Sequence, residues 1–310
     1  MVQWAIVSPA ARRLAPVLVV LGALLYGCGS EVMEAPDPVP RGDQNRPGIA
    51  PAAGGIARRD PLAGSASRRP TLTITVDDTG PGKFRYRAPR VVRGGLVEIS
   101  LRNIGEVPHK AQLWRIDGGH TLAEALRVGY PQPDWLRTAG GVSLTAPKST
   151  SRTLQSLPAG SYYVAGTLDQ PGAVAAFSVT AANGAARVPR APARIEAIDF
   201  SFKVSGLKAG RNSVDFDNTG QEPHHAFLAP MTAGAKLADV KRFFNRPTST
   251  GPEPVDGEGT RETVVLEGGA RQVTELDLEA GRYALVCFVR GRHGGPRHIE
   301  LGMINEVSVR

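Results

Sequence analysis

The sequence predicts an all-β protein of two tandem Greek-key β-sandwiches that follow an export signal and a disordered tether. Three observations lead to this fold class. One block of residues occurs twice at a long spacing, much of the chain alternates apolar with polar residues between turns, and each copy has one short segment with helical spacing. Antiparallel strands in a unit of roughly 110 residues are typical of sandwiches with Greek-key connections.

The internal repeat divides the chain. The block NIGEVPHKAQL at residues 103–113 matches NTGQEPHHAFL at residues 218–228, an offset of 115 residues. Further on, LPAGSYYVAG at residues 157–166 matches LEAGRYALVC at residues 278–287, where the offset has grown to 121. Self-similarity of this kind indicates a repeated structural unit, so we expect two copies of one domain.

Each copy, at residues 71–182 and 190–310, is predicted to consist of strands and one short helix. Segments such as LVEISLRN and RYALVCFV alternate apolar with other residues at a period of two, which is the pattern of half-buried strands. The segments TLAEALRVG and KLADVKRFF space their apolar residues by three and four instead, so each predicts a helix. Residues 181–193, with several prolines and alanines, form the predicted boundary.

The N-terminal segment predicts export. Arg12 and Arg13 precede an apolar segment at residues 14–25 that is too short to span a bilayer comfortably, as in a signal peptide over residues 1–27. The segment ends in LYGC, which resembles the lipobox of bacterial lipoproteins, so Cys28 is expected to carry a lipid that anchors the protein in the cell envelope. An ordinary cleaved signal and an uncleaved anchor are the alternatives. All three place the remaining chain outside the cytoplasm.

Composition restricts the remaining possibilities. Residues 28–70 are rich in Pro, Gly, Ala and charge without a lasting apolar period, so they predict a flexible tether. The formal charge of the whole chain is +8, which favours acidic partners or anionic surfaces. No run of basic residues is interleaved with aromatic residues, so no nucleic-acid partner is expected.

The residues that can carry chemistry lie near the end of the chain, in CFVRGRHGGPRHIELGM at residues 287–303. Cys287 shares a strand face with Tyr283 and Leu285, so its sulfur should point into the sandwich, where a lone cysteine is often a small hydrophobic residue. In an exported chain, however, Cys28 is used by the lipid or lost with the signal. Cys287 then stays unpaired in an oxidising compartment, and its presence calls for another reason.

A mononuclear type 1 copper centre supplies such a reason. It uses a soft thiolate, two imidazoles and a weak axial thioether, with most ligands on the loop between the last two strands. The sequence offers His224 after an Asn-x-Gly turn, and Cys287, His298 and Met303 around the final loop before EVSVR. In NTGQEPH, GRYALVC and HIELGM the second copy resembles the cupredoxins, the blue copper proteins related to plastocyanin and azurin. The resemblance covers most of residues 190–310 and implies a β-sandwich that holds one copper ion in this C-terminal domain.

Two features depart from the family pattern. Ten residues separate Cys287 from His298, so the loop must bulge outward or rearrange, and His293 is a second choice that would shorten the interval. His225 competes with His224, but the first copy has His-Lys where the second has His-His, so His224 is the position that the repeat shares.

The first copy is expected to lack the metal. Gly166 takes the place of Cys287, and TLDQPGAVAAFSV after it contains neither His nor Met. Without a thiolate, a type 1 copper centre cannot form. The first copy is therefore expected to act as a packing partner, spacer or docking surface.

The function expected from these residues is one-electron transfer by an exported, lipid-anchored copper protein facing the periplasm or the exterior, with a redox partner protein. Val286 and Phe288 flank Cys287, so no adjacent histidine leads to a second copper ion. No G-x-S-x-G, HExxH or phosphate-binding glycine motif is present, and an enzyme is not expected. The alternatives are a protein that carries or sequesters copper, exchanging it with a donor or acceptor, and a metal-free cupredoxin-like binding module.

Overall fold

The computed structural model describes residues 69–166, 174–182, 187–245 and 252–310. The predicted signal peptide, Cys28 and nearly all of the predicted tether lie outside the described residues. Within them the chain forms many strands and two short helices, which confirms the all-β prediction. In these ranges no helix has the length and apolar character needed to cross a membrane.

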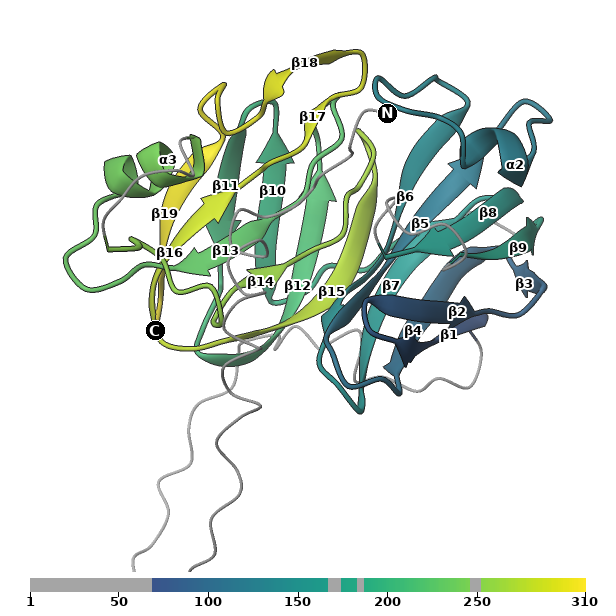
Figure 1. Cartoon of the computed structure of the whole chain (residues 1–310), viewed down its shortest axis with the longest axis horizontal. Coiled ribbons are helices and arrows are strands. Elements are labelled where there is room, and N and C mark those ends of the chain that lie inside the picture. Colours follow the sequence, from purple (N-terminus) through teal and green to yellow (C-terminus); the bar gives the residue numbers. More distant parts are fainter. Residues whose placement is uncertain (1–68, 167–173, 183–186, 246–251) are drawn as a thin grey trace, which may run out of the picture.

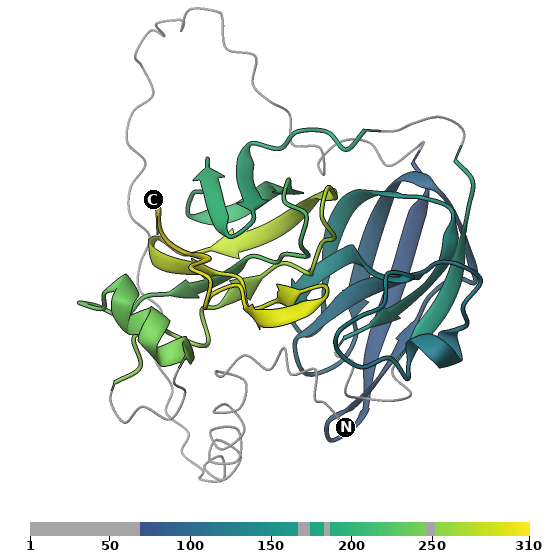
Figure 2. The same ribbon diagram turned by 90° about the horizontal axis from the view of Figure 1, so that it is seen from above.

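The two copies of the repeat share one sheet of eight strands. The strand order is palindromic, because the strands of the second copy occur in the reverse order of their counterparts in the first. Figure 1 shows the second copy, green to yellow, beside the first, blue to teal, and the view from above in Figure 2 agrees. In spatial order the strands are β11 (Ser201–Ser205), β10 (Ala193–Ile198), β12 (Gly210–Asn218), β15 (Arg271–Leu278), β7 (Ser149–Leu157), β4 (Gly95–Asn103), β1 (Thr71–Gly80) and β2 (Lys83–Arg87).

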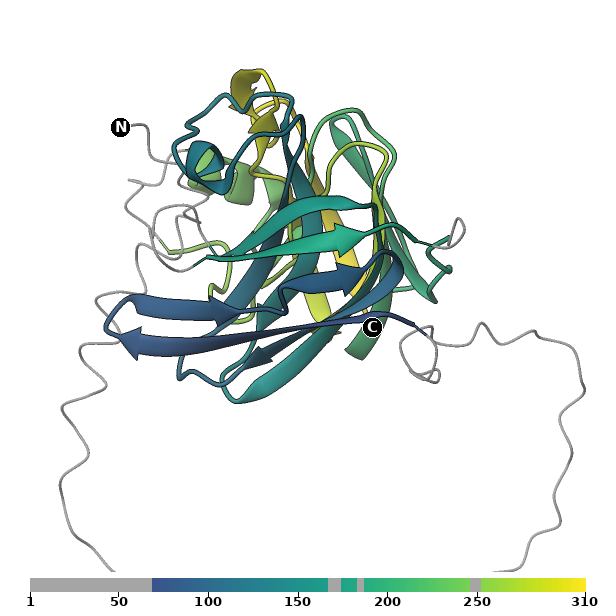
Figure 3. The same cartoon turned by 90° about the vertical axis from the view of Figure 1, so that its right-hand side faces the viewer.

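A second, smaller sheet covers each half of the shared sheet. In both copies the first strand pairs in parallel with a later one, β1 with β4 and β10 with β12, while most other neighbours are antiparallel. Figure 3 turns the first copy toward the viewer. The smaller sheets are β3 (Val91–Arg93), β9 (Ala175–Thr180), β8 (Gly160–Ala165), β5 (His109–Ile116) and β6 (Leu136–Thr145) in the first copy, and β14 (Arg261–Glu262), β13 (Phe227–Pro230), β16 (Gly281–Val286) and β19 (Ile304–Val309) in the second.

The segment between the last two long strands forms a separate two-stranded hairpin. Its strands are β17 (Arg290–Gly291) and β18 (Gly294–Arg297), which pair with each other and with no other strand. The sequence predicted a loop here that bulges outward or rearranges. The excursion between Cys287 and His298 is an ordered hairpin that stands out from the sandwich (Figure 1).

Both predicted helices are present. The first, α2 (Leu122–Ala125), begins after Thr121, whose hydroxyl accepts the N–H of Glu124 while the Glu124 carboxylate accepts the N–H of Thr121. This reciprocal capping box satisfies two of the N–H groups that a helix start leaves free. The second helix, α3 (Leu237–Asn245), buries Val240, Phe243 and Phe244.

Alternating side chains of the strands build a separate core in each copy. Along β10 every second residue is buried, as a period of two requires. The same alternation places Tyr283, Leu285 and Cys287 in the core of the second sandwich, as predicted. Ala284, Val286 and Phe288 face the opposite side and pack against the phenylalanines of α3. Consequently the thiol of Cys287 points inward.

Candidate metal centre

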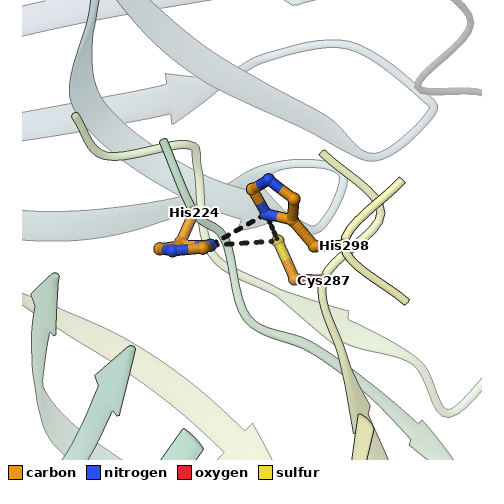
Figure 4. Close-up of side chains that lie close together, drawn as sticks. All are labelled: His224, Cys287 and His298. Atoms are coloured by element: carbon orange, nitrogen blue, oxygen red, sulfur yellow. Dashed lines mark hydrogen bonds between the residues drawn. The ribbon is translucent and has the colours of Figure 1, made fainter. Parts of the chain in front are cut away.

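Three side chains from separate segments of the second copy converge in its interior. Cys287 follows the last residue of β16, His298 follows the last residue of β18, and His224 lies in the turn before β13. His224 forms an isolated β-bridge with Leu266, three residues before β13 begins. The three side chains point toward one another in Figure 4.

The facing atoms are those that bind a soft metal ion. The Cys287 Sγ lies 3.7 Å from the His224 Nδ1 and 3.5 Å from the His298 Nδ1, and the two Nδ1 atoms lie 3.0 Å apart. Three atoms at these separations share a point about 2.0 Å from each, close to the lengths of metal–nitrogen and metal–thiolate bonds. The triangle therefore fits a single ion bound by one sulfur and two nitrogens.

A carboxylate fixes the orientation of one imidazole. The Nε2–H of His224 donates to Asp199 Oδ1 at 2.8 Å, so the lone pair of Nδ1 faces the cluster. Asp199 also accepts the backbone N–H groups of Gln221 and Glu222 at 2.8 and 3.3 Å. Partial burial acts to raise the pKa of Asp199, but these hydrogen bonds outweigh it and the pKa is lowered, so the carboxylate stays ionised.

Burial sets the protonation state of the metal-free cluster. Cys287, His224 and His298 are all 0% exposed. Burial raises the pKa of the Cys287 thiol to about 12, lowers that of His298 to about 3 and lowers that of His224. The Nε2 atom of His298 is buried without a hydrogen-bond partner among the described residues, and the ring of Phe200 packs edge-on at 4.9 Å. The cluster is thus a neutral thiol between two neutral imidazoles, sealed from water.

Met303 lies in the same core, where the backbone holds it beside the cluster. It is fully buried with Cys287. The N–H of Cys287 donates to the carbonyl of Met303 at 3.2 Å, and the N–H of Met303 donates to the carbonyl of His298 at 2.9 Å. The structure therefore brings three predicted ligand residues together and places Met303 in the same core as Cys287.

No protein-family model and no curated protein matches the chain. Among solved structures, auracyanin B is 22% identical over 40% of this chain and 93% of its own, with a TM-score of 0.25. An auracyanin from Roseiflexus castenholzii is 16% identical over 38% and 94%, with a TM-score of 0.25. A multicopper oxidase is 17% identical over 77% and 88%, with a TM-score of 0.22.

The fold assignment depends on the sandwich topology and on the buried His-Cys-His cluster. The fold is cupredoxin-like. It comprises two such sandwiches, of which the second holds the cluster and the first does not.

Neither alternative histidine joins the cluster of the cupredoxin-like domain. His225 follows His224 directly, but its Nε2 accepts the N–H of Phe288 at 3.0 Å, and its ring packs near Phe227 and Phe288. Burial lowers the pKa of His225 to about 3, so it is a neutral core histidine. His293 is exposed in the turn between β17 and β18.

The first cupredoxin-like domain has His109 at the position of His224, but aromatic side chains fill the space that the Cys287 thiol occupies in the second domain. His109 Nε2 bonds Asp78 Oδ1 at 2.7 Å, as His224 bonds Asp199. A Cβ atom at Gly166, the counterpart of Cys287, would lie 2.6 Å from the hydroxyl of Tyr86 and 3.2 Å from the ring of Phe84. Aromatic side chains thus occupy the place where a ligand would need room.

Sequence reasoning missed the aspartate. A signal was available, because Asp78 and Asp199 stand 121 residues apart, the offset of the later matching blocks of the repeat. The surrounding residues differ between the copies, so the match was not visible as a motif. Its role emerges only when β10 ends beside the turn of His224.

Proposed function

We propose that this protein binds one copper ion in a type 1 centre and transfers single electrons. The observation that carries the proposal is the convergence of Cys287 Sγ with the Nδ1 atoms of His224 and His298 at a fully buried point. Thiolate with two imidazoles is the donor set that type 1 copper takes. Copper bound there would supply a one-electron couple between Cu(II) and Cu(I).

Each residue has a distinct role in this proposal. Cys287 would bind the ion as a thiolate after giving its proton to solvent, and His224 and His298 would bind it through their Nδ1 lone pairs. Met303 would supply a weak thioether contact that tunes the potential. Asp199 holds the His224 ring in the ligating orientation. Because these three side chains are fully buried, they would stay in place when the charge of a bound ion changed, and little reorganisation would oppose electron exchange.

Burial favours electron transfer over chemistry at the metal. All three converging ligands are 0% exposed, so the site presents no open position to a substrate, which catalytic metal sites keep. The same burial favours a resident ion over a cargo that must be released. We therefore rank electron transfer above copper delivery or sequestration.

The proposal extends to location and partners. Cys28 in the LYGC motif would carry the lipid that holds the protein in the cell envelope, facing the periplasm or the exterior. The tether predicted over residues 28–70 would let the folded part reach a redox partner protein. Both statements rest on the sequence.

Copper titration tests the proposal. Cu(II) added to the purified full chain should bind in a one-to-one ratio and produce an intense thiolate-to-copper absorption. The band should be lost in Cys287→Ser, shifted in Met303→Leu and unchanged in the exposed-site control His293→Ala. A chain that binds no copper and stays colourless would contradict the copper function and support a metal-free binding module. Copper binding with rapid release and slow electron exchange would support a protein that carries copper.

A further inference from the structure

The hairpin between Cys287 and His298 contacts the first domain, whose sequence contains no cysteine. Tyr130, in the connection between α2 and β6, donates its hydroxyl to the carbonyl of Gly291 at 2.8 Å. Arg292 donates its guanidinium to the carbonyls of Pro133 and Leu136 at 3.4 and 3.2 Å. Figure 1 shows β17 and β18 at the top of the second domain, leaning toward the first.

Arg292 also contacts residues of its own domain, the second. Its guanidinium forms an ion pair with Glu267, and its backbone N–H donates to Glu222 Oε2 at 2.7 Å. Glu267 in turn accepts the hydroxyl of Thr138 from β6 at 3.3 Å. The side chains of Arg292 and Glu267 are only 10% and 14% exposed. Hydrogen bonds between charged groups in such a setting are stronger than ordinary surface ion pairs.

The hairpin ends where the cluster begins. Immediately beyond it, the N–H of His298 donates to the carbonyl of Val289 at 2.8 Å, and the N–H of Ile299 donates to the carbonyl of Cys287 at 2.9 Å. Any movement of β17 and β18 therefore moves the backbone that carries His298. A free excursion of this length would have to be ordered each time the ion binds, at a cost in conformational entropy.

We propose that the first domain is a clamp that positions the His298 hairpin, with Arg292 and Tyr130 as the positioning residues. This inference rests on the proposed copper function and gives a role to the domain that has Gly166 in place of the cysteine. The clamp orders the long interval between Cys287 and His298 before the ion arrives. It thereby keeps the Nδ1 atom of His298 near the thiol in the metal-free protein.

The test compares Arg292→Met with Arg290→Met in the full chain. Arg290 is an exposed arginine of the same hairpin that bonds the carbonyl of Gly295 within it, so its loss should leave the clamp intact. In the metal-free protein, the backbone amides of His298 and Ile299 should exchange about tenfold faster in Arg292→Met and at an unchanged rate in Arg290→Met. Tyr130→Phe, a milder change, should give a smaller increase in the same direction.

Copper release is the second measurement. Loss of a group that supports a metal ligand typically lowers metal affinity by about 10–100-fold. Arg292→Met should therefore release copper about tenfold faster than the unaltered chain and shift the charge-transfer band, while Arg290→Met should do neither.

The outcomes separate the two proposals. Unchanged hairpin exchange in both Arg292→Met and Tyr130→Phe would overturn the clamp. Faster exchange with an unaltered band and an unaltered release rate would also overturn it, because the contacts would then be structural without positioning His298. If the unaltered chain binds no copper, the copper function fails, and the exchange measurement alone decides whether the first domain orders the hairpin.

Discussion

The smallest unit that the two domains share is a histidine bonded to an aspartate. His224 with Asp199 and His109 with Asp78 have the same geometry, and each aspartate also accepts two backbone N–H groups of the turn that precedes the histidine. The first domain keeps the pair without a thiol. The pair is thus part of the turn, and Cys287 and His298 are what distinguish the second domain.

Asp199→Asn should weaken copper binding by about 10–100-fold, since the neutral amide no longer holds the His224 ring with a charged acceptor. Competition with a chelator of known affinity would measure the change. Asp78→Asn makes the same alteration in the domain without a thiol and should leave copper affinity unchanged. Equal losses in both variants would mean that the effect is on folding and not on the ligand.

Asp78 should make the free energy of unfolding depend on pH in the acidic range. Partial burial acts to raise its pKa, but hydrogen bonds from the N–H groups of Glu106 and Val107 and from His109 outweigh it and hold the pKa below the ordinary 3.8. The ionised carboxylate therefore stabilises the fold above about pH 4, and this contribution is lost as the pH falls through the lowered value.

Urea unfolding at two pH values checks this sign. Asp78→Asn should lower the free energy of unfolding at about pH 7, and the difference from the unaltered chain should shrink toward about pH 2. Asp77→Asn, the neighbouring position on the opposite face of β1, is the control. A deficit in Asp78→Asn that is equal at both pH values would contradict the linkage.

Gly166 shows why the first domain cannot recover the missing ligand by one change. An added Cβ atom would lie 2.6 Å from the Tyr86 hydroxyl, which itself donates to the carbonyl of Lys110. Gly166→Ala should therefore lower the free energy of unfolding by about 1–3 kcal/mol, as overpacking does. Gly129→Ala, where no atom lies within 4 Å of the added Cβ, should change it by less than about 1 kcal/mol. Equal effects of the two substitutions, measured by urea unfolding, would show that the Tyr86 side chain moves aside at no cost in stability.

At the scale of elements, local patterns in the sequence predicted strands and helices well. The period of two placed Cys287 on the same inward face as Tyr283 and Leu285, and the structure confirms that placement. The helical spacing of KLADVKRFF predicted α3. Each signal spans only a few neighbouring residues, because it reports which face of one element is apolar.

The hairpin of β17 and β18 escaped prediction for a physical reason. Its residues GRHGGPR show no apolar alternation, because the hairpin has no buried apolar face. Polar contacts hold it instead, from Tyr130 to Gly291 and from Arg292 to the carbonyls of Pro133 and Leu136. Tyr130 and Gly291 are 161 residues apart, and no local pattern connects them. Asp199 and His224 were missed as a pair for a similar reason, because β11 lies between them.

At the scale of the whole molecule, the repeat predicted two sandwiches but not that a strand of one pairs with a strand of the other in a single sheet. Strands β7 and β15 pair antiparallel, with Leu154 opposite Val273 and Thr153 opposite Thr274. The buried hydroxyl of Thr274 bonds those of Thr153 and Ser143 at 3.1 and 3.0 Å. Each of these strands would be the edge of a separate sandwich, and pairing them removes two exposed edges.

Because the sheet is continuous, the two domains should unfold in one cooperative transition. Trp114 and Trp135 report on the first domain and the thiol of Cys287 on the second, in a Trp4→Phe, Cys28→Ser chain where no other tryptophan or cysteine remains. Tryptophan fluorescence and thiol labelling across a urea series should give the same midpoint, since coincident probes are the mark of a two-state transition.

Thr274→Val tests whether the join causes that cooperativity. The change leaves the buried hydroxyls of Thr153 and Ser143 short of a partner, at a cost of about 1–3 kcal/mol. Both probes should shift together to lower urea, whereas the exposed control Thr150→Val on the same β7 should shift neither. If fluorescence and thiol labelling give different urea midpoints in the unaltered chain, the two sandwiches unfold independently. The continuous sheet would then be a contact between two independent domains, and the first domain could order the copper hairpin only while both remained folded.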